Sequence, residues 1–325
     1  MEERLQTAVE DAETRPTLIV QTIYFETDDD PAKDRERESA ARLGSALYGL
    51  LTRPADAPWR HGHGIPVRVA TEAKHVALDE ELNEAQHLVL VPVLGEALLV
   101  DERRRREAIQ RVNAWHTKIG ATGCVLPLLV NGAWRSFADD LVPSPKFREV
   151  GQDLFEPLMD VVSAAARVLL GDTPLPKLYI SHAATDDDDV ASTAIHLFRC
   201  FKDSEGASHF FRDFELVSRT ASEQVAEENK LPGALIAIRS DRSHTLAWCQ
   251  RELMRAKRLQ WPTLVVDVLT DGEERAFPYG GNAPTMVWRR DSGKDDSSRR
   301  VALRASAQTL AWRHHRLEAE RVIKA

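Results

Sequence analysis

The stretch from Leu235 to Val268 constrains the fold most, because it contains two short apolar runs separated by a polar loop and a charged segment. Short continuous apolar runs bounded by polar residues are typical of buried parallel strands. The charged segment has helical spacing, and Thr245 is its expected N-cap. A strand, a helix and a second strand in this order predict part of a parallel sheet that is covered by helices.

The same alternation runs through the rest of the chain. Apolar runs and helical periodicities follow one another on both sides of a central break, with an acidic turn after the first strand of each half. The expected fold class is therefore α/β, with two flavodoxin-like parallel-sheet domains in tandem. The expected strands include Thr17–Phe25, Leu88–Leu94, Cys124–Val130, Leu178–Ser181, Ser208–Phe211 and Pro284–Trp288, and the expected helices include Asp79–Gln86, Glu102–Ile119, Phe147–Leu170, Val190–Phe201, Thr220–Asn229 and Arg299–Ile323.

The segment from Gly171 to Pro176 is the clearest domain boundary. Glycine ends helices, and the two prolines in this segment prevent another helix from starting. A chain of 325 residues also has the length of about two domains. We therefore expect one domain at residues 1–171 and a second at residues 172–325.

Composition excludes several classes of protein. The net charge of −8 disfavours general attraction to nucleic acid or to anionic membranes. The longest apolar stretch, Leu88–Val100, is too short to span a bilayer, and the N-terminal residues do not resemble a secretory signal. The three cysteines show no zinc-binding spacing, which favours a reducing cytoplasm. We also expect no metal at the loop histidines His61 and His63, which lack supporting cysteines or carboxylates.

The position of Glu252 in the predicted fold is typical of a functional residue. Trp248 and Glu252 are four residues apart, so they share one face of the predicted helix near its first turns. A carboxylate there faces the positive end of the helix dipole. It also follows the carboxyl end of a strand, where open α/β sheets place their ligands. The alternative is a glutamate that is simply solvated on a helix surface.

Three boxes of sequence resemble the family of TIR domains. Trp248-Cys-x-x-Glu252-Leu resembles the Trp-Cys-x-x-Glu-Leu signature, and Trp-x-x-x-Glu is the spacing found in TIR enzymes that cleave NAD+. Leu178–Ala183 resembles the opening box of the family, and Phe211–Leu216 resembles its second box. The three boxes occur in the family's order and cover roughly Lys177 to Trp288.

The resemblance implies an NAD+ glycohydrolase in which Glu252 is the catalytic residue. Nicotinamide leaves NAD+ as a neutral molecule, so its departure needs no general acid, and one of the two carboxylates of ordinary glycoside hydrolysis becomes unnecessary. A single carboxylate can stabilise the oxocarbenium-like ribose that remains. NAD+ is then the substrate, and no cofactor or metal is expected. The substrate-binding residues implied are Trp248, Ser181, His182, Ala183, Asp213 and Phe214.

The resemblance also implies how such a protein is used. The resemblance suggests a cytoplasmic effector of antiviral or immune-type signalling that is activated by self-association. An upstream activator is a further partner that it allows. The segment Asp213–Thr220 resembles the family's mobile loop, which borders the pocket and the self-association surface, although a glycine of the family's loop is missing. The first domain has Trp115 followed four residues later by Ile119, so we expect a TIR-like domain without catalysis.

Two other functions remain open from the sequence. The second domain could be a signalling adaptor that binds only other TIR domains, or an enzyme similar to nucleoside deoxyribosyltransferases on a related fold. Trp248 has its own alternative, which is packing in the core. The spacing of Trp248 and Glu252 favours the NAD+-cleaving enzyme over the adaptor.

Overall fold

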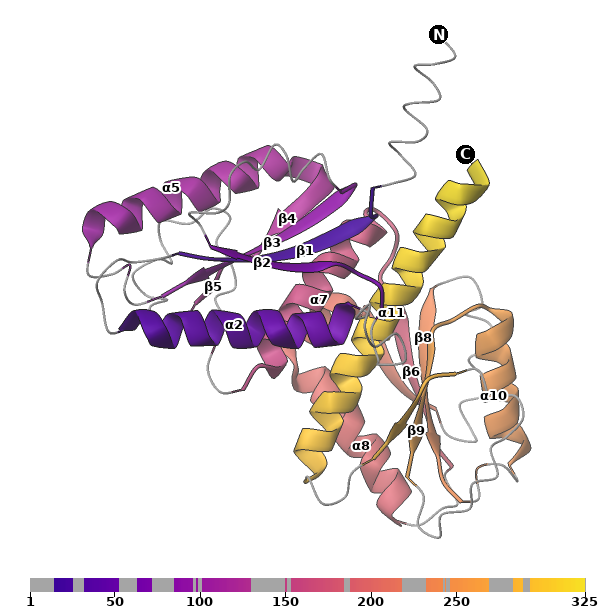
Figure 1. Ribbon diagram of the computed structural model, residues 1–325. Helices are drawn as coiled ribbons and strands as arrows, with labels where there is room; N and C mark the ends of the chain where they lie inside the picture. Colours follow the sequence, from indigo (N-terminus) through magenta and orange to yellow (C-terminus); the bar gives the residue numbers. More distant parts are fainter. Residues whose placement is uncertain are drawn as a thin grey trace. The chain divides into compact units, whose positions relative to one another are not determined.

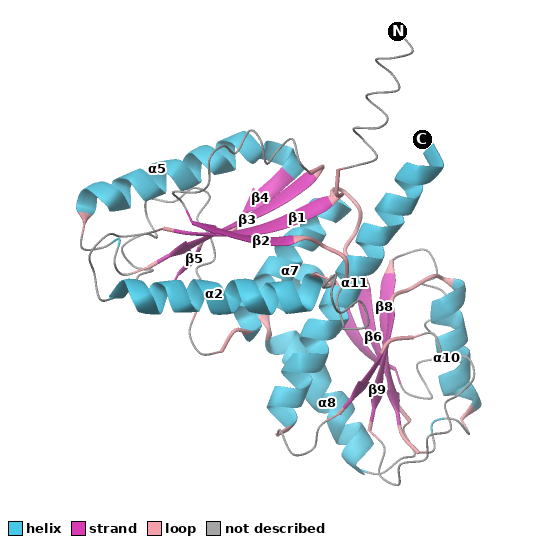
Figure 2. Ribbon diagram, viewed as in Figure 1, coloured by secondary structure: helices cyan, strands magenta, loops and turns pink. Residues whose placement is uncertain are grey.

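The computed structural model describes residues 15–25, 32–52, 63–71, 85–95, 98, 101–129, 150, 153–183, 188–217, 232–241, 243, 246–268, 283–288 and 293–324 (Figures 1 and 2). The chain divides into two compact units. Unit 1 comprises Met1–Gly171 and Leu310–Ala325, and unit 2 comprises Asp172–Thr309.

Unit 1 is a parallel sheet with helices on both faces. Its strands are β1 (Leu18–Tyr24), β2 (Val67–Thr71), β3 (His87–Leu94), β4 (Gly123–Val125) and β5 (Leu128–Leu129). They pair in parallel in the order β2-β1-β3-β4, and β5 also pairs with β3. The helices are α2 (Ala32–Leu51), α5 (Glu102–Ile119) and α7 (Phe155–Leu170). Figure 1 shows α5 on one face of this sheet and α2 on the other.

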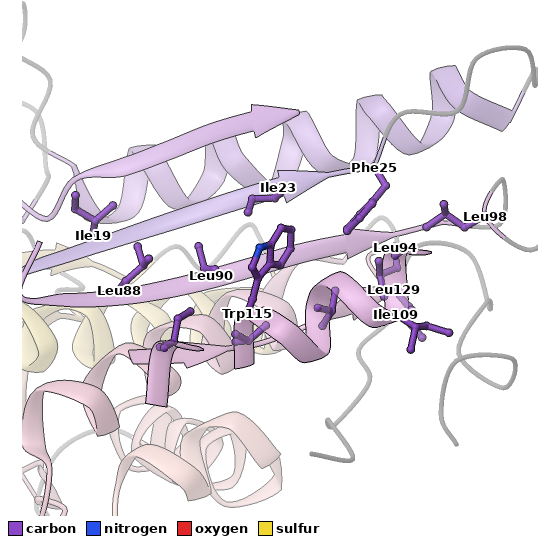
Figure 3. Close-up of a cluster of buried hydrophobic side chains, with 14 of the residues drawn as sticks. Ile19, Ile23, Phe25, Leu88, Leu90, Leu94, Leu98, Ile109, Trp115 and Leu129 are labelled. Atoms are coloured by element: carbon purple, nitrogen blue, oxygen red, sulfur yellow. The ribbon is translucent and has the colours of Figure 1, made fainter. Parts of the chain in front are cut away.

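One core cluster of unit 1 lies between its sheet and α5 (Figure 3). Alternate residues of β1, Ile19 and Ile23, point to this face because successive side chains of a strand point to opposite faces. Helix α5 contributes Trp115, whose ring centroid lies 6.0 Å from that of Phe25. The helix begins at the N-cap Asp101, whose carboxylate accepts hydrogen bonds from the next backbone N–H groups, and it ends at a glycine with positive φ.

Unit 2 contains a second parallel sheet. Its strands are β6 (Lys177–Ser181), β7 (Asp213–Val217), β8 (Gly233–Arg239), β9 (Thr263–Asp267) and β10 (Thr285–Val287). Their order is β10-β9-β8-β6-β7, and every pairing is parallel. Counted along the chain, this is the 2-1-3-4-5 order of flavodoxin-like folds, and the first four strands of unit 1 follow the same order. The expected α/β fold class with two parallel-sheet domains is confirmed.

Helices cover both faces of the sheet of unit 2. They are α8 (Asp188–Asp203), α9 (Glu205–Phe210), α10 (Ala247–Arg258) and the part of α11 (Lys294–Lys324) that belongs to this unit. Figure 1 shows α10 and α8 on opposite faces. Leu253 and Ala256 of α10 pack on Tyr179 and Leu235 of the sheet. This face therefore carries the helix that was expected to hold the functional site.

The end of α10 fixes an aromatic stack on the same face. Gln260 has a positive φ of 55°, and the N–H of Trp261 donates to the carbonyl of Ala256, which closes the helix. The ring of Trp261 then stacks on Tyr179 at a centroid distance of 4.9 Å. A Cβ atom on Gly233 would lie 2.6 Å from this ring, so β8 must begin with a residue that has no side chain.

Several expected boundaries are corrected by the structure. Ser208–Phe211, expected to be a strand, falls mostly within helix α9, and the neighbouring strand is β7. Helix α10 begins at Ala247 with Leu246 in the N-cap position, while Thr245 lies outside the described residues. The segment Cys124–Val130 contains two short strands instead of one. The expected helix Thr220–Asn229, and Asp79–Gln86 up to residue 84, also lie outside the described residues.

The boundary near Gly171 has the expected position, but the second domain does not extend to residue 325. Gly171 has a φ of 54° and ends α7, and unit 2 begins at the next residue. Helix α11 continues past Thr309 without a break, but its residues from Leu310 onward contact unit 1 and therefore belong to that unit. Arg313 Nε donates to the carbonyl of Leu169 at 3.4 Å, and Arg321 Nη1 donates to that of Arg15 at 2.7 Å.

Candidate functional site

Ser181 and Glu252, two of the residues expected to form the site, come from the carboxyl edge of the sheet of unit 2. Ser181 is the last residue of β6, and α10, which contains Glu252, follows β8 in the chain. Ser181 pairs in register with Ala237, two residues before the end of β8. Ligands of open parallel sheets bind beyond this edge, where helices also begin. The topology therefore places both side chains where the sequence predicted a site.

Ser181 and Glu252 are in direct contact. Ser181 Oγ donates a hydrogen bond to Glu252 Oε2, across 71 positions of the sequence. Ser181 is buried, which fixes its hydroxyl under the helix. The other carboxylate oxygen, Oε1, is inaccessible to solvent and has no hydrogen-bond partner among the described residues. A buried oxygen without a partner is costly, so a hydrogen bond donated to this atom would be stabilising.

Burial raises the pKa of Glu252 to about 7. The hydrogen bond from Ser181 and the positive charge of Arg255 act in the opposite direction, and the negative charge of Glu215 adds to the increase. Loss of water around a carboxylate penalises its charged form, which explains why burial dominates. Glu252 is thus not the fully solvated helix glutamate that the sequence left as its alternative.

An ion pair lies at the same edge of the sheet, where β8 and β9 end. Arg239 and Asp267 are partners in the parallel register, and their side chains point to one face. Arg239 donates from Nε to Oδ1 at 2.6 Å and from Nη2 to Oδ2 at 2.5 Å. The Asp267 side chain is only 10% exposed and that of Arg239 24%. This bidentate ion pair joins two neighbouring strands beside the site. The sequence alone did not predict it.

The residues around Ser181 and Glu252 differ in how much surface they offer. Trp248 is 7% exposed, which is the burial of a packed side chain and favours the core alternative over an aromatic wall for a substrate. Ala183 is completely buried, so it offers no exposed surface to a ligand. His182 is half-buried and follows Ser181 directly.

Asp213 and Phe214 lie at the opposite edge of the sheet. Asp213 pairs with Lys177, four residues before Ser181, which corresponds to about 13 Å along a strand. The Asp213 carboxylate lies 3.6 Å from Lys177 Nζ, and Phe214 packs against the rings of Phe201 and Phe211. The structure therefore does not bring these two residues to Glu252. Their expected loop is the strand β7 as far as Val217, and residues 218–220 lie outside the described residues.

The pair Trp115 and Ile119 of unit 1 lies at the end of its helix, whereas Trp248 and Glu252 lie in the first half of α10. Helix α5 is the first described long helix after β3, as α10 is after β8. Trp115 and Ile119, the pair that the sequence compares with Trp248 and Glu252, are 6% and 3% exposed, and both belong to one buried core cluster, in which Figure 3 labels Trp115.

Comparisons with known proteins leave the family of this chain open. No protein-family model and no curated protein sequence matches it. Among solved structures, a tagatose-6-phosphate ketose/aldose isomerase from Escherichia coli matches with 11% identity, 97% coverage of this chain, 88% coverage of that chain and a TM-score of 0.25. A likeness at this score supports no inference about function. Within the described residues, no helix combines the length and apolar character needed to cross a membrane.

Proposed function

We propose that unit 2 is an NAD+ nucleosidase of the TIR type, which hydrolyses the bond between nicotinamide and ribose. The observation that carries this proposal is the carboxylate of Glu252 at the carboxyl edge of a flavodoxin-like sheet, where ligands of such sheets bind. Ser181 holds one of its oxygens, and the other has no hydrogen-bond partner within the described part of the chain. The spacing of Trp248 and Glu252, and the three sequence boxes described above, support the same function.

Each oxygen of Glu252 would have a separate task. Oε2 is already occupied by the hydroxyl of Ser181, which limits rotation of the carboxylate. Oε1 can accept a hydrogen bond from a ribose hydroxyl and place its negative charge near the anomeric carbon. As the carbon–nitrogen bond breaks, its electron pair leaves with nicotinamide, and the ribose becomes positively charged. Water then attacks that carbon and loses a proton.

The proposed role requires Glu252 to be ionised, whereas burial raises its pKa to about 7. The positive nicotinamide ring of NAD+ would favour the ionised form when it binds nearby. We therefore expect the rate at low substrate concentration to rise with pH through about 7, which is the pKa of the free enzyme's carboxyl group.

Replacing Ser181 with alanine should shift this pH dependence to higher pH. The hydrogen bond from Ser181 lowers the pKa of Glu252, so its loss leaves the carboxyl group protonated over a wider range. The loss of activity should then be largest at pH 6 and smaller at pH 8.5. The measurement is kcat/KM for NAD+ between pH 5.5 and 9 for both proteins.

Ser208→Ala provides the matched control for this experiment. Ser208 also donates its hydroxyl in a hydrogen bond, to the carbonyl of Glu205 at 2.7 Å, but it is exposed on α9. Its removal should leave the pH profile unchanged. If Ser181→Ala lowers activity by the same factor at every pH, Ser181 does not act on the ionisation of Glu252.

The function itself is tested by incubating the purified full chain with NAD+ and separating the products by chromatography. We expect nicotinamide together with ADP-ribose or a cyclic isomer. Absence of any cleavage, including at high protein concentration, would favour the adaptor. Transfer between nucleosides without NAD+ cleavage would favour the deoxyribosyltransferase-like enzyme.

Self-association and an upstream activator belong to the same proposal. Phe214 and Leu216 belong to the segment that was expected to be a mobile loop bordering the self-association surface, but they lie within β7, and Phe214 is packed against other rings. Assembly therefore rests on the family resemblance alone. If the active state forms only on association, activity per enzyme should increase across a hundredfold range of protein concentration, whereas a constant value would mean that the monomer is active.

A further inference from the structure

A cluster of metal-ligating side chains lies on α11, in the part that belongs to unit 1. His314 and Glu318 are one helical turn apart, and His315 follows His314 directly. One ligand atom from each residue can be chosen so that all three lie within 4.8 Å of one another. Two imidazoles and one carboxylate form a ligand set that zinc uses in proteins.

His314 supplies an independent observation. It is 1% exposed, and neither of its ring nitrogens has a hydrogen-bond partner among the described residues. Buried imidazoles normally satisfy their nitrogens, because an unpaired polar group loses its water without compensation.

The spacing of the buried nitrogen and the carboxylate fits a shared ion. His314 Nε2 lies 3.5 Å from Glu318 Oε1. Two ligands at about 2.1 Å from a tetrahedral zinc ion are roughly 3.4 Å apart. This distance is long for a direct hydrogen bond but suits two ligands of one metal.

The other two ligands face solvent, which leaves a path for an ion. His315 is exposed, and the Glu318 side chain is 40% exposed. His315 Cε1 lies 3.5 Å from the position that a Cβ atom would take on Gly64, so the imidazole ring lies beside the backbone of this glycine.

We propose that His314, His315 and Glu318 bind one divalent transition-metal ion, with Zn²⁺ the best fit to the ligand set. The ion would take one vacant nitrogen of His314 and neutralise Glu318, and a water molecule would complete four-coordination on the exposed side. This site is separate from the proposed NAD+ site and does not depend on it.

The test uses the full chain without a polyhistidine tag, treated with a chelator and dialysed. Zn²⁺ is titrated against a chromophoric competitor, and bound metal is counted by elemental analysis. We expect one ion per chain and a rise in the temperature of unfolding on adding Zn²⁺. Replacement of Zn²⁺ by Co²⁺ should give the visible absorption bands of a tetrahedral site.

Variants identify the ligands. Glu318→Gln and His315→Ala alter side chains on the exposed side, so the fold should be retained. Each should weaken Zn²⁺ binding by at least about tenfold, since even a residue that only supports a ligand has an effect of this size. Glu320→Gln is the matched control, because Glu320 is similarly exposed on the same helix but pairs with Arg316 at 3.0 Å.

The outcomes are separable. Loss of binding in Glu318→Gln and His315→Ala, with normal binding in Glu320→Gln, supports the site. Absence of stoichiometric binding by the unaltered chain would overturn it and leave His314 and Glu318 as ordinary neighbours on one face of the helix. Equal binding by all three variants would overturn it as well, because the ion would then lie elsewhere.

Discussion

Replacing Glu252 with glutamine is expected to reduce NAD+ cleavage by at least about 10³-fold, since the charge that stabilises the transition state is lost. Glutamine has nearly the same shape and can still form a hydrogen bond with Ser181, so the substitution changes the charge and little else. The measurement is the rate of nicotinamide release under single-turnover conditions at pH 8, where the unaltered carboxyl group is ionised.

The same variant has a signature in stability that does not depend on catalysis. The pKa of Glu252 in the folded protein is raised from 4.5 to about 7, so between these values the folded state holds a proton that the unfolded state has lost. The free energy of unfolding of the original protein should therefore fall as pH rises from 4.5 to 7. Glu252→Gln should lack this contribution and melt at the same or a higher temperature at pH 8. Undiminished NAD+ cleavage in this variant would refute the catalytic role.

Arg239→Ala should destabilise unit 2 by about 3 kcal/mol, because it leaves a buried carboxylate without its partner. Asp267 is 7% exposed, and both of its oxygens accept hydrogen bonds from Arg239. Removing the guanidinium leaves Asp267 either charged without compensation or protonated. The measurement is urea unfolding of the full chain at pH 7.5, with Arg239→Met/Asp267→Leu as a second variant that removes both charges and should recover most of the stability.

Arg103→Ala is the control for the effect of burial. Arg103 also donates from Nε to a carboxylate, that of Glu107 at 2.9 Å, but the two side chains are 86% and 53% exposed. Exposed pairs contribute between about 0 and 1 kcal/mol, so this change should have little effect. An equally small effect of Arg239→Ala would show that the pair at the edge of the sheet is solvated in the same way.

Much of the fold follows from local patterns, because buried parallel strands are continuous apolar runs. Leu178–Ser181 and Leu88–Leu94 were located from such runs alone. Ser208–Phe211 was wrongly assigned to a strand, since a run of this length has no distinct period. The hydroxyl of Ser204 accepts a hydrogen bond from the N–H of Ala207 and starts a helix there. Strand β7 begins at Asp213, which pairs with Lys177 at the amino end of β6 and therefore lies at the edge of the sheet opposite Glu252.

The candidate site was predictable in outline only. The order of strands and helices placed Ser181 and Glu252 at one edge, but their hydrogen bond depends on how α10 sits on the sheet. The pair of Arg239 and Asp267 depends on the register between β8 and β9, which neither strand encodes locally. Its one signal in the sequence is that a charged residue ends each apolar run. His314 and His315 were overlooked because they lie within a helix that otherwise has many solvated charges.

Unit 1 is discontinuous in sequence, and this has a consequence for synthesis on the ribosome. Its two segments are separated by the whole of unit 2, so residues from Leu310 onward emerge only after unit 2 has been translated. Arg321 meets its hydrogen-bond partner Arg15 across 306 positions. Domains fold as units during translation, and unit 2 can therefore be complete while unit 1 still lacks its last helical segment. Until then, nascent chains would expose the surface of unit 1 that this segment later covers, and exposed surface of this kind makes a partly folded chain prone to aggregation.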